Sequence, residues 1–388
     1  MDGNARPRVS LEQRLAAELE QIRAAHLYRL RRVVEGGHGA ELFINGRRCV
    51  NFCSNDYLGL AADARIAEAA RKSLGESGTG SGAAALVSGY NREHQALEEE
   101  LAAYTGRARA LLFSTGWAAN LGVLRALLGR EDTLIADELN HASLIDGGRL
   151  SGARYVRVRH RDTSAFAAAL GNSSGNTLVA TDRIFSMDGD IAPVNGLVPL
   201  CGQHGAALMV DDAHGFGVVP ATAELRSAEI YVATLGKALG CAGAFVAGSE
   251  NLIEFLIQRA RSWVFSTAPP PALAAAARAS LRIAASDEGD ERRRRLFANV
   301  SRFREGAHQR GIALSESVTS IQPLLLGDEQ RALKLSQFLY ERGSWVAAIR
   351  PPTVPRGTAR LRITFSAAHT SEQVEQLLDG LAAGLKPE

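Results

Sequence analysis

The apolar positions of the chain gather in short runs that are separated by longer stretches with helical spacing. Mainly apolar runs of this kind occupy 108–113, 133–136, 153–158, 177–181, 206–210 and 230–234. A short continuous apolar run predicts a strand that is buried on both faces of a sheet. Because helical segments alternate with these strands, the pattern predicts an α/β domain with a mainly parallel sheet and helices on both faces.

The N-terminal part predicts two further elements. Leu11, Leu15, Leu19 and Ile22 begin an apolar stripe with a spacing of three or four residues, which predicts one helix over 11–33. Residues 41–52 predict a hairpin with Asn45 and Gly46 at its turn.

The C-terminal part predicts a smaller α+β domain. A proline-rich break at 266–271 halts regular structure before an alanine-rich helix. Strands are predicted at 321–326, 345–349 and 359–364, with helices between them. The chain is therefore divided into an N-terminal segment 1–45, a large domain 46–270 and a small domain 271–388.

The composition of the chain argues against several classes of protein. The chain has 388 residues, more than one ordinary core needs, and a formal net charge of +2, which argues against a nucleic-acid surface. No apolar run approaches membrane-spanning length and the first residues lack a signal-peptide core, so we expect no membrane association and a cytoplasmic location. The four cysteines have neither a CxxC pair nor zinc-site spacing, which predicts free thiols and no metal site.

Candidate chemistry concentrates between residues 206 and 243. The buried run 206–210 ends at Asp211 and Asp212, and His214 follows before a glycine-rich turn. A pair of acids at this place is costly unless a cation meets it. Because open α/β sheets bind ligands at the carboxyl ends of their strands, Asp211 and His214 are predicted to lie in an active site.

A lysine lies beyond the next predicted strand. Lys237 is surrounded by small and apolar residues, which would desolvate its amine and favour a nucleophilic role. An acid, a histidine and a lysine on neighbouring strand ends are what pyridoxal phosphate requires: the lysine forms a Schiff base and the acid keeps the ring nitrogen protonated. Taken singly, Asp211 could cap a helix, His214 could be a satisfied core residue and Lys237 could be solvated. Their combination in this order favours the cofactor site.

Several motifs extend this pattern along the chain. They are MVDDAHGFG at 209–217, TLGKALG at 234–240, NFCSNDYLGL at 51–60, FSTGWAAN at 113–120, FSMDGD at 185–190 and AIRPPTVPRGTARLRI at 348–363. With them the sequence resembles the α-oxoamine synthase family of fold type I pyridoxal phosphate enzymes. The resemblance implies a mainly parallel seven-stranded sheet with helices on both faces, a smaller C-terminal α+β domain and a homodimer with shared active sites.

The resemblance also implies a reaction. The family joins an amino acid to an acyl thioester with loss of carbon dioxide. The 348–363 motif and Arg29 favour the branch that uses L-alanine and a pimeloyl thioester. Siblings that use glycine or serine stay open as alternatives, as does a non-catalytic protein on the same fold.

Residue roles for the cofactor follow from the same resemblance. Catalytic roles fall to Lys237, Asp211, His214 and His141, whose ring is expected to stack on the cofactor. The phosphate is expected at the mouth of a helix, where free N–H groups and the helix dipole favour an anion. The cofactor-binding residues implied in addition are Thr115, Gly116, Trp117, Ser186, Thr234 and, reaching the partner subunit's cofactor, Thr267. Ser186 could instead be a turn serine and His141 a surface residue that begins a helix.

The implied substrate contacts come from both ends of the chain. Arg29 is expected to reach the carboxylate end of the acyl substrate, although it could also be one of several helix-surface arginines. Asn55 lies in a loop that borders the acyl-carrier site in the family, and His141 also faces the substrate. Arg360 and Arg362 alternate with apolar residues and so share one side of a strand. Arg362 is expected to bind the α-carboxylate, with Thr353 beside the substrate. The loop after Gly217 is shorter than relatives usually have, and we expect a trimmed surface without loss of activity.

Overall fold

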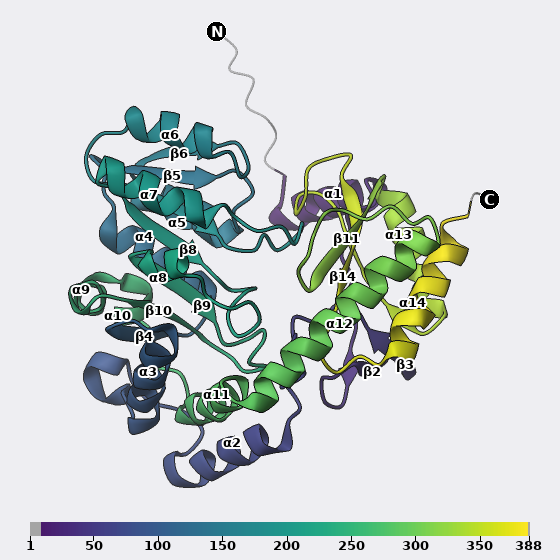
Figure 1. Ribbon diagram of the computed structural model, residues 1–388, viewed down its shortest axis with the longest axis horizontal. Helices are drawn as coiled ribbons and strands as arrows, with labels where there is room; N and C mark the ends of the chain where they lie inside the picture. Colours follow the sequence, from purple (N-terminus) through teal and green to yellow (C-terminus); the bar gives the residue numbers. More distant parts are fainter. Residues whose placement is uncertain (1–8, 387–388) are drawn as a thin grey trace.

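The computed structural model describes residues 9–386 as two lobes that the long helix α12 (Asp287–Gln309) connects (Figure 1). The large lobe contains one seven-stranded sheet in the order β4-β10-β9-β8-β7-β5-β6. Its strands are β4 (Arg109–Phe113), β5 (Thr133–Asp137), β6 (Arg154–Val158), β7 (Thr177–Asp182), β8 (Ala207–Asp211), β9 (Ile230–Thr234) and β10 (Ala244–Gly248). Only β10 pairs antiparallel with its neighbours, β4 and β9, and the other pairs are parallel. The predicted mainly parallel seven-stranded sheet is confirmed, but the sequence pattern missed β10.

Two hydrophobic layers cover this sheet. Successive residues of β8 point to opposite faces, so Leu208 and Val210 join one core cluster and Met209 joins the other. One face carries α4 (Gly116–Leu127), α5 (Ala142–Ser151), α9 (Glu250–Arg259) and α10 (Arg261–Val264). The opposite face carries α3 (Arg92–Thr105), α6 (Thr163–Gly171), α7 (Val194–His204), α8 (Ala223–Ser227) and α11 (Pro271–Ala284), against which α2 (Ala64–Ser77) packs. The prediction of helices on both faces is therefore confirmed.

The small lobe combines residues from both ends of the chain. One sheet has the order β11 (Ile321–Gly327), β14 (Ala359–Thr364), β13 (Ala347–Ile349), and α13 (Glu329–Glu341) and α14 (Ser371–Gly384) pack beside it. A second sheet has the order β1 (Val34–Glu35), β2 (Glu41–Ile44), β3 (Arg47–Asn51), β12 (Ser344–Trp345). The predicted hairpin is confirmed at β2 and β3, while the strand predicted over 345–349 is divided between β12 and β13. The domain boundaries at 45 and 270 stay predictions, and the parallel pairing of β3 with β12 favours grouping the hairpin with the small lobe.

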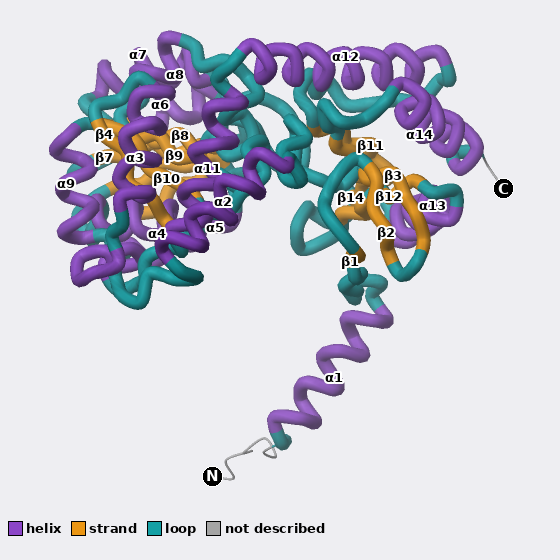
Figure 2. The backbone as a smooth tube through the Cα atoms, turned by 90° about the horizontal axis from the view of Figure 1, so that it is seen from below, coloured by secondary structure: helices purple, strands orange, loops and turns teal. Residues whose placement is uncertain are grey.

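The helix predicted over 11–33 is wrong in its second half. Helix α1 covers only Leu11–Ala24, because His26 adopts a left-handed conformation with φ 57°. Beyond it, Arg350 donates hydrogen bonds to the carbonyl oxygens of His26 and Tyr28 and holds the chain in a non-helical course. Figure 2 shows α1 projecting from the small lobe, and its apolar stripe is exposed.

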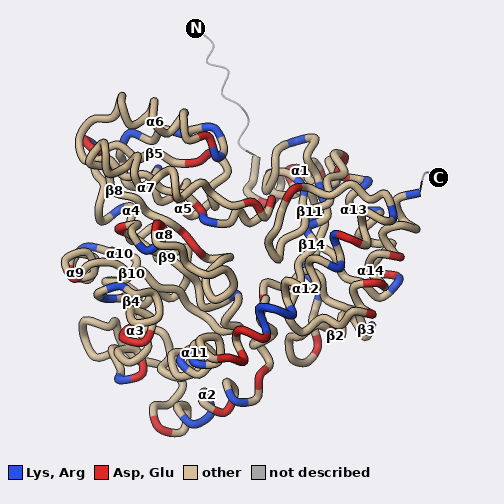
Figure 3. Tube along the Cα trace, in the orientation of Figure 1, with Lys and Arg blue, Asp and Glu red and all other residues tan. Residues whose placement is uncertain are grey.

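The start of α12 carries acidic residues over 287–291, and four arginines follow directly at 292–295 (Figure 3). Arg292 pairs with Glu288 and also donates to the carbonyl oxygens of Leu58 and Gly59. These bonds attach the helix to the loop that follows the hairpin. Within residues 9–386, every helix is too short or too polar to cross a bilayer.

Candidate active site

Lys237 lies in the turn that joins β9 to β10. The turn is closed by hydrogen bonds from the Gly240 N–H to the Lys237 carbonyl, 2.8 Å, and from the Cys241 N–H to the Leu235 carbonyl, 2.9 Å. Gly240 has φ 62°, and a Cβ on it would lie 2.4 Å from the Ala61 nitrogen, so this close approach requires glycine. Burial lowers the pKa of Lys237 to about 8, although the carboxylates of Asp211 and Asp182 oppose the shift. Roughly a tenth of the amine is therefore neutral at pH 7, far more than for an ordinary lysine.

His214 connects this amine to the small lobe. Its Nε2 lies 2.9 Å from Lys237 Nζ and its Nδ1 lies 2.6 Å from the Tyr57 hydroxyl. Burial and the neighbouring Lys237 hold the pKa of His214 well below its usual range, so the ring is neutral. Because Tyr57 donates its own proton to Asn55 Oδ1 at 3.1 Å, we assign the imidazole proton to Nδ1, which leaves Nε2 as the acceptor for Lys237.

Asp211 ends β8 in a buried position, with 5% of its surface exposed. Its Oδ2 accepts a 2.7 Å hydrogen bond from Asn120 Nδ2, and its Oδ1 accepts one of 2.9 Å from the Ala213 N–H. Burial and the adjacent Asp211 raise the pKa of Asp182 well above its usual range, and its Oδ2 accepts from the His141 N–H at 2.6 Å. Asn120 was missed as a functional residue, although it is the last residue of the motif at 113–120; its position four residues into α4 turns it toward β8.

Pyridoxal phosphate fits this set of donors and acceptors. Among residues 9–386, Asp211 forms no ion pair within 4.0 Å, and both of its hydrogen-bond donors are neutral. A buried carboxylate of this kind is costly without a cation, and the protonated ring nitrogen of the cofactor supplies one. Lys237 offers the amine that the aldehyde requires.

The phosphate residues lie at the start of α4. Thr115 is the N-cap of the helix, and its Oγ1 accepts from the Ala118 N–H at 3.0 Å. A Cβ on Gly116 would meet nothing within 4 Å, so the helix mouth is open. The Trp117 ring packs edge-on against His141 with centroids 6.1 Å apart, and His141 is itself exposed at the start of α5. The structure thus brings the predicted phosphate site beside the predicted stacking residue.

Three further predicted cofactor residues lie around this region. Thr234 donates to the Gly243 carbonyl at 3.0 Å and accepts from the Gly236 N–H at 3.2 Å, so its hydroxyl shapes the lysine turn. Ser186 presents its carbonyl to Arg362 Nε. Thr267 is exposed, forms a bridge with Ala84, and lines a cavity of about 30 Å³ with Ser114; no contact joins it to Lys237 in the described part of this chain.

Four predicted substrate residues, Arg362, Asn55, Arg29 and Thr353, form two groups. Arg362 reaches Asn55 Oδ1 with both terminal nitrogens, at 3.2 and 3.1 Å. A continuous chain of contacts therefore runs from Lys237 through His214, Tyr57 and Asn55 to Arg362, and Tyr57 is a member that sequence reasoning missed. The second group is outside this chain: Arg29 donates to Thr353 Oγ1 at 3.2 Å, and both residues are exposed.

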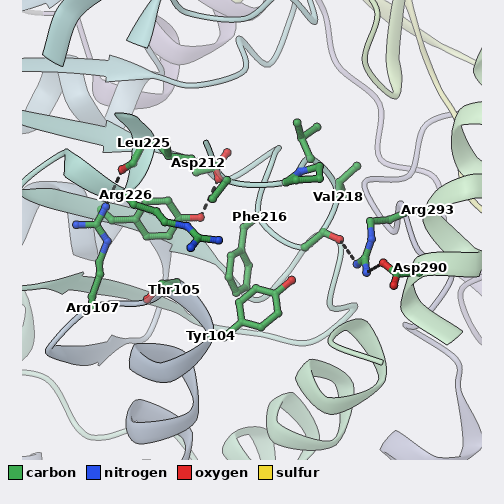
Figure 4. Close-up of a pocket in the computed structure, with 15 residues that line it drawn as sticks. Tyr104, Thr105, Arg107, Asp212, Phe216, Val218, Leu225, Arg226, Asp290 and Arg293 are labelled. Carbon is green, nitrogen blue, oxygen red and sulfur yellow. Dashed lines mark hydrogen bonds and ion pairs between the residues drawn. The ribbon is translucent and has the colours of Figure 1, made fainter. Parts of the chain in front are cut away.

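A separate cavity of about 310 Å³ lies next to the turn after β8 (Figure 4). Asp212 and Phe216 line it, whereas Asp211, His214 and Lys237 do not. Tyr104 packs edge-on against Phe216 there, with ring centroids 5.5 Å apart. Residues 217–221, the shortened loop, form part of its wall.

Comparison with known proteins identifies the family. A profile described as "Aminotransferase class I and II" matches residues 47–381. The 8-amino-7-oxononanoate synthase of Thioalkalivibrio sulfidiphilus is 54% identical in an alignment of 384 positions that covers 96% of this chain and 97% of that protein. The enzyme of the same name from Methylococcus capsulatus is 54% identical in an alignment of 383 positions that covers 96% of this chain and 98% of that one. The chain belongs to the 8-amino-7-oxononanoate synthase branch of the class I and II aminotransferase family.

Solved structures of this family have the same fold. A serine palmitoyltransferase from Sphingomonas wittichii matches with a TM-score of 0.90 and 32% identity over 97% of this chain and 98% of that chain. Another, from S. paucimobilis with bound PLP, gives 0.91 and 28% over the same shares. An 8-amino-7-oxononanoate synthase from Francisella tularensis gives 0.75 and 30%, over 86% of this chain and 97% of that chain. These matches confirm the predicted family, the fold type I architecture and the dependence on pyridoxal phosphate.

Proposed function

We propose that this chain catalyses the decarboxylative condensation of L-alanine with a pimeloyl thioester. The products are 8-amino-7-oxononanoate, carbon dioxide and the free thiol of the acyl carrier. The observation that carries the proposal is the unbroken contact chain from Lys237 to Arg362, because it combines a weakly basic amine with an anion clamp in one site. The near full-length identity with enzymes of this name supports the choice of reaction.

Each residue around the cofactor site has a distinct chemical role. When bound, pyridoxal phosphate supplies an electron sink for the negative charge that develops at the α-carbon. Asp211 would hold the ring nitrogen in its protonated form, and Asn120 orients that carboxylate. Lys237, with its pKa lowered to about 8 by burial, accepts and returns the α-proton. His214, held neutral, accepts from Lys237 at Nε2 and keeps the amine directed toward the site.

Two arginines would recognise the substrates at their carboxylates. Arg362 is buried, with 7% of its surface exposed, and can grip the α-carboxylate with two N–H groups. Arg29 and Thr353 at the exposed group would receive the distal carboxylate of the pimeloyl chain. A palmitoyl chain has no distal carboxylate and would give Arg29 no partner. The role of Arg29 therefore favours a pimeloyl thioester over the palmitoyl thioester that a serine palmitoyltransferase would use.

Substrate tests decide between the siblings. Steady-state assays with pimeloyl, succinyl, acetyl and palmitoyl thioesters, each with L-alanine, glycine and L-serine, should give the highest kcat/KM for pimeloyl with L-alanine. A preference for another acyl group by more than tenfold would refute the assignment. The Lys237→Ala variant should have no turnover. Wild-type enzyme prepared and assayed in parallel is the control, because its turnover shows that the assay works.

We also propose a homodimer that functions in the cytoplasm. The exposed apolar stripe of α1 and the exposed position of Thr267 beside the phosphate region support a partner subunit that completes the site. The four cysteines are free thiols, which is typical of a reducing compartment. Sedimentation analysis of the holoenzyme tests the dimer, and a monomer with full activity would contradict it.

A further inference from the structure

The loop after β7, residues 184–191, contacts the small-lobe strand β14. Arg362 donates from Nε to the Ser186 carbonyl, and Arg360 pairs with the Asp188 carboxylate. On its other side, the Gly189 carbonyl accepts from the hydroxyls of Ser317 and Thr319, at 2.8 and 2.9 Å. This loop therefore holds the Nε side of the Arg362 guanidinium, and Asn55 holds its two terminal nitrogens.

His160 lies behind this loop and bridges two carboxylates. Its Nδ1 is 2.9 Å from Asp137 Oδ1 and its Nε2 is 2.7 Å from Asp190 Oδ2. An ionised carboxylate only accepts hydrogen bonds, so both ring nitrogens donate and the ring is an imidazolium. The ring also packs edge-on against Phe185, with centroids 4.4 Å apart. The contacts with Phe185 and Asp190 join His160 to both ends of the FSMDGD segment.

The other end of the bridge is fixed. Asp137 ends β5, is 1% exposed, and accepts from the backbone N–H groups of Leu139 and Arg161, at 2.9 and 2.8 Å. His160 thus connects the loop to a buried strand end. The guanidinium of Arg161 also reaches Asp190 at 3.2 Å, but its side chain is 47% exposed and holds the loop less firmly.

The charge on His160 persists at neutral pH. Burial alone would lower the pKa of His160, but the hydrogen bonds to Asp137 and Asp190 raise it to about 9. The remaining charged neighbours are Arg161, on Asp190, and Glu138, whose carboxylate accepts from the His160 backbone N–H at 3.1 Å.

We infer that His160 is a positioning residue for amino-acid binding: through Asp190 it fixes the 185–190 loop, and the Ser186 carbonyl then orients Arg362 toward the α-carboxylate. This inference rests on the proposed role of Arg362. A purely structural His160 would change stability and leave the affinity for the amino acid unchanged.

Variants of the holoenzyme test this inference. His160→Gln and Asp190→Asn should each raise the dissociation constant for L-alanine about tenfold, measured as the change in cofactor absorbance on titration, because each removes a charge-assisted hydrogen bond. The KM for the pimeloyl thioester should change less than twofold. The double variant should equal the single ones, since both residues act through the same bond.

Arg159→Gln is the matched control. Arg159 is the neighbouring residue, its side chain is 77% exposed, and within residues 9–386 its one ion pair is with Asp162, so its removal should leave the L-alanine affinity unchanged. If His160→Gln does not fold, Asp190→Asn carries the test because it keeps the imidazole. Unchanged L-alanine affinity in the two single variants, or additive effects in the double variant, would overturn the inference. If wild type instead binds glycine or L-serine, the proposed substrate fails, and the same comparison is made with that amino acid because the α-carboxylate is common to all three.

Discussion

Asn120 provides the sharpest test of the cofactor site. Its side chain is 1% exposed, and its Nδ2 donates to both Asp211 Oδ2, at 2.7 Å, and Ser143 Oγ, at 2.8 Å. Asn120→Ala would leave Asp211 with the Ala213 N–H as its remaining donor in the described chain. A hydrogen bond to a charged group contributes about 1.5–3 kcal/mol, so the affinity for pyridoxal phosphate should fall roughly 10- to 100-fold.

The measurement is a titration of apoenzyme with pyridoxal phosphate, followed by cofactor absorbance. Asn299→Ala is the matched control, because Asn299 is also buried, at 8% exposure, and donates to the Ser366 and His369 carbonyls in the small lobe. Both variants should lose comparable thermal stability, but only Asn120→Ala should lose cofactor affinity. Equal cofactor affinities in the two variants would refute the view that Asn120 orients Asp211.

Three further predictions concern other parts of the chain. Arg29→Gln should raise the KM for the pimeloyl thioester about tenfold and leave L-alanine affinity unchanged, as steady-state kinetics and titration would measure. The pKa of His160 is raised from 6.5 to about 9, so its protonated form stabilises the fold by at most about 3 kcal/mol. This stabilisation is complete below pH 6.5 and is lost as the pH rises through 9. His160→Gln should therefore flatten the decline of the thermal midpoint between pH 7 and 9.5, and an unchanged slope would contradict the assignment. Gly240→Ala should cost at least about 2 kcal/mol in denaturant unfolding, because its φ is 62° and the added Cβ would lie 2.4 Å from the Ala61 nitrogen.

The sequence predicted those parts of the fold that local pattern determines. Continuous apolar runs identified the parallel strands, and the rule that ligands bind at carboxyl ends placed Asp211 and Lys237 at the same edge of the sheet. Strand β10 was missed because its run of five residues, of which two are alanine and one is glycine, directly follows the glycine-rich lysine turn. The end of α1 at Ala24 was missed because the residue that holds the chain beyond it, Arg350, lies more than 300 positions away in the sequence.

The local sequence pattern could not predict the contacts that complete the site. Tyr57 and Asn120 both belong to motifs that were recognised, but their roles depend on tertiary partners. Tyr57 connects His214 to Asn55, and Asn120 reaches from α4 to the end of β8. Spacing along the chain shows that such residues are near the site but does not show which atom each one touches.

Three acids lie at the carboxyl ends of β7 and β8, Asp182, Asp211 and Asp212, and their neighbours differ in a way that favours Asp211 as the partner of the cofactor. Asp212 Oδ2 is 2.9 Å from Arg183 and accepts from the Tyr231 hydroxyl at 2.8 Å, so it has a cation of its own. Burial and Asp211 raise the pKa of Asp182 well above its usual range, which favours its neutral form and weakens its attraction for a cation. Within the chain as described from 9 to 386, Asp211 therefore has no arginine partner, while burial favours the neutral form of Asp182. A protonated ring nitrogen at this edge of the sheet is therefore stabilised most by Asp211. Arg183→Met should weaken this preference, because it would leave Asp212 as a second buried acid without a cation.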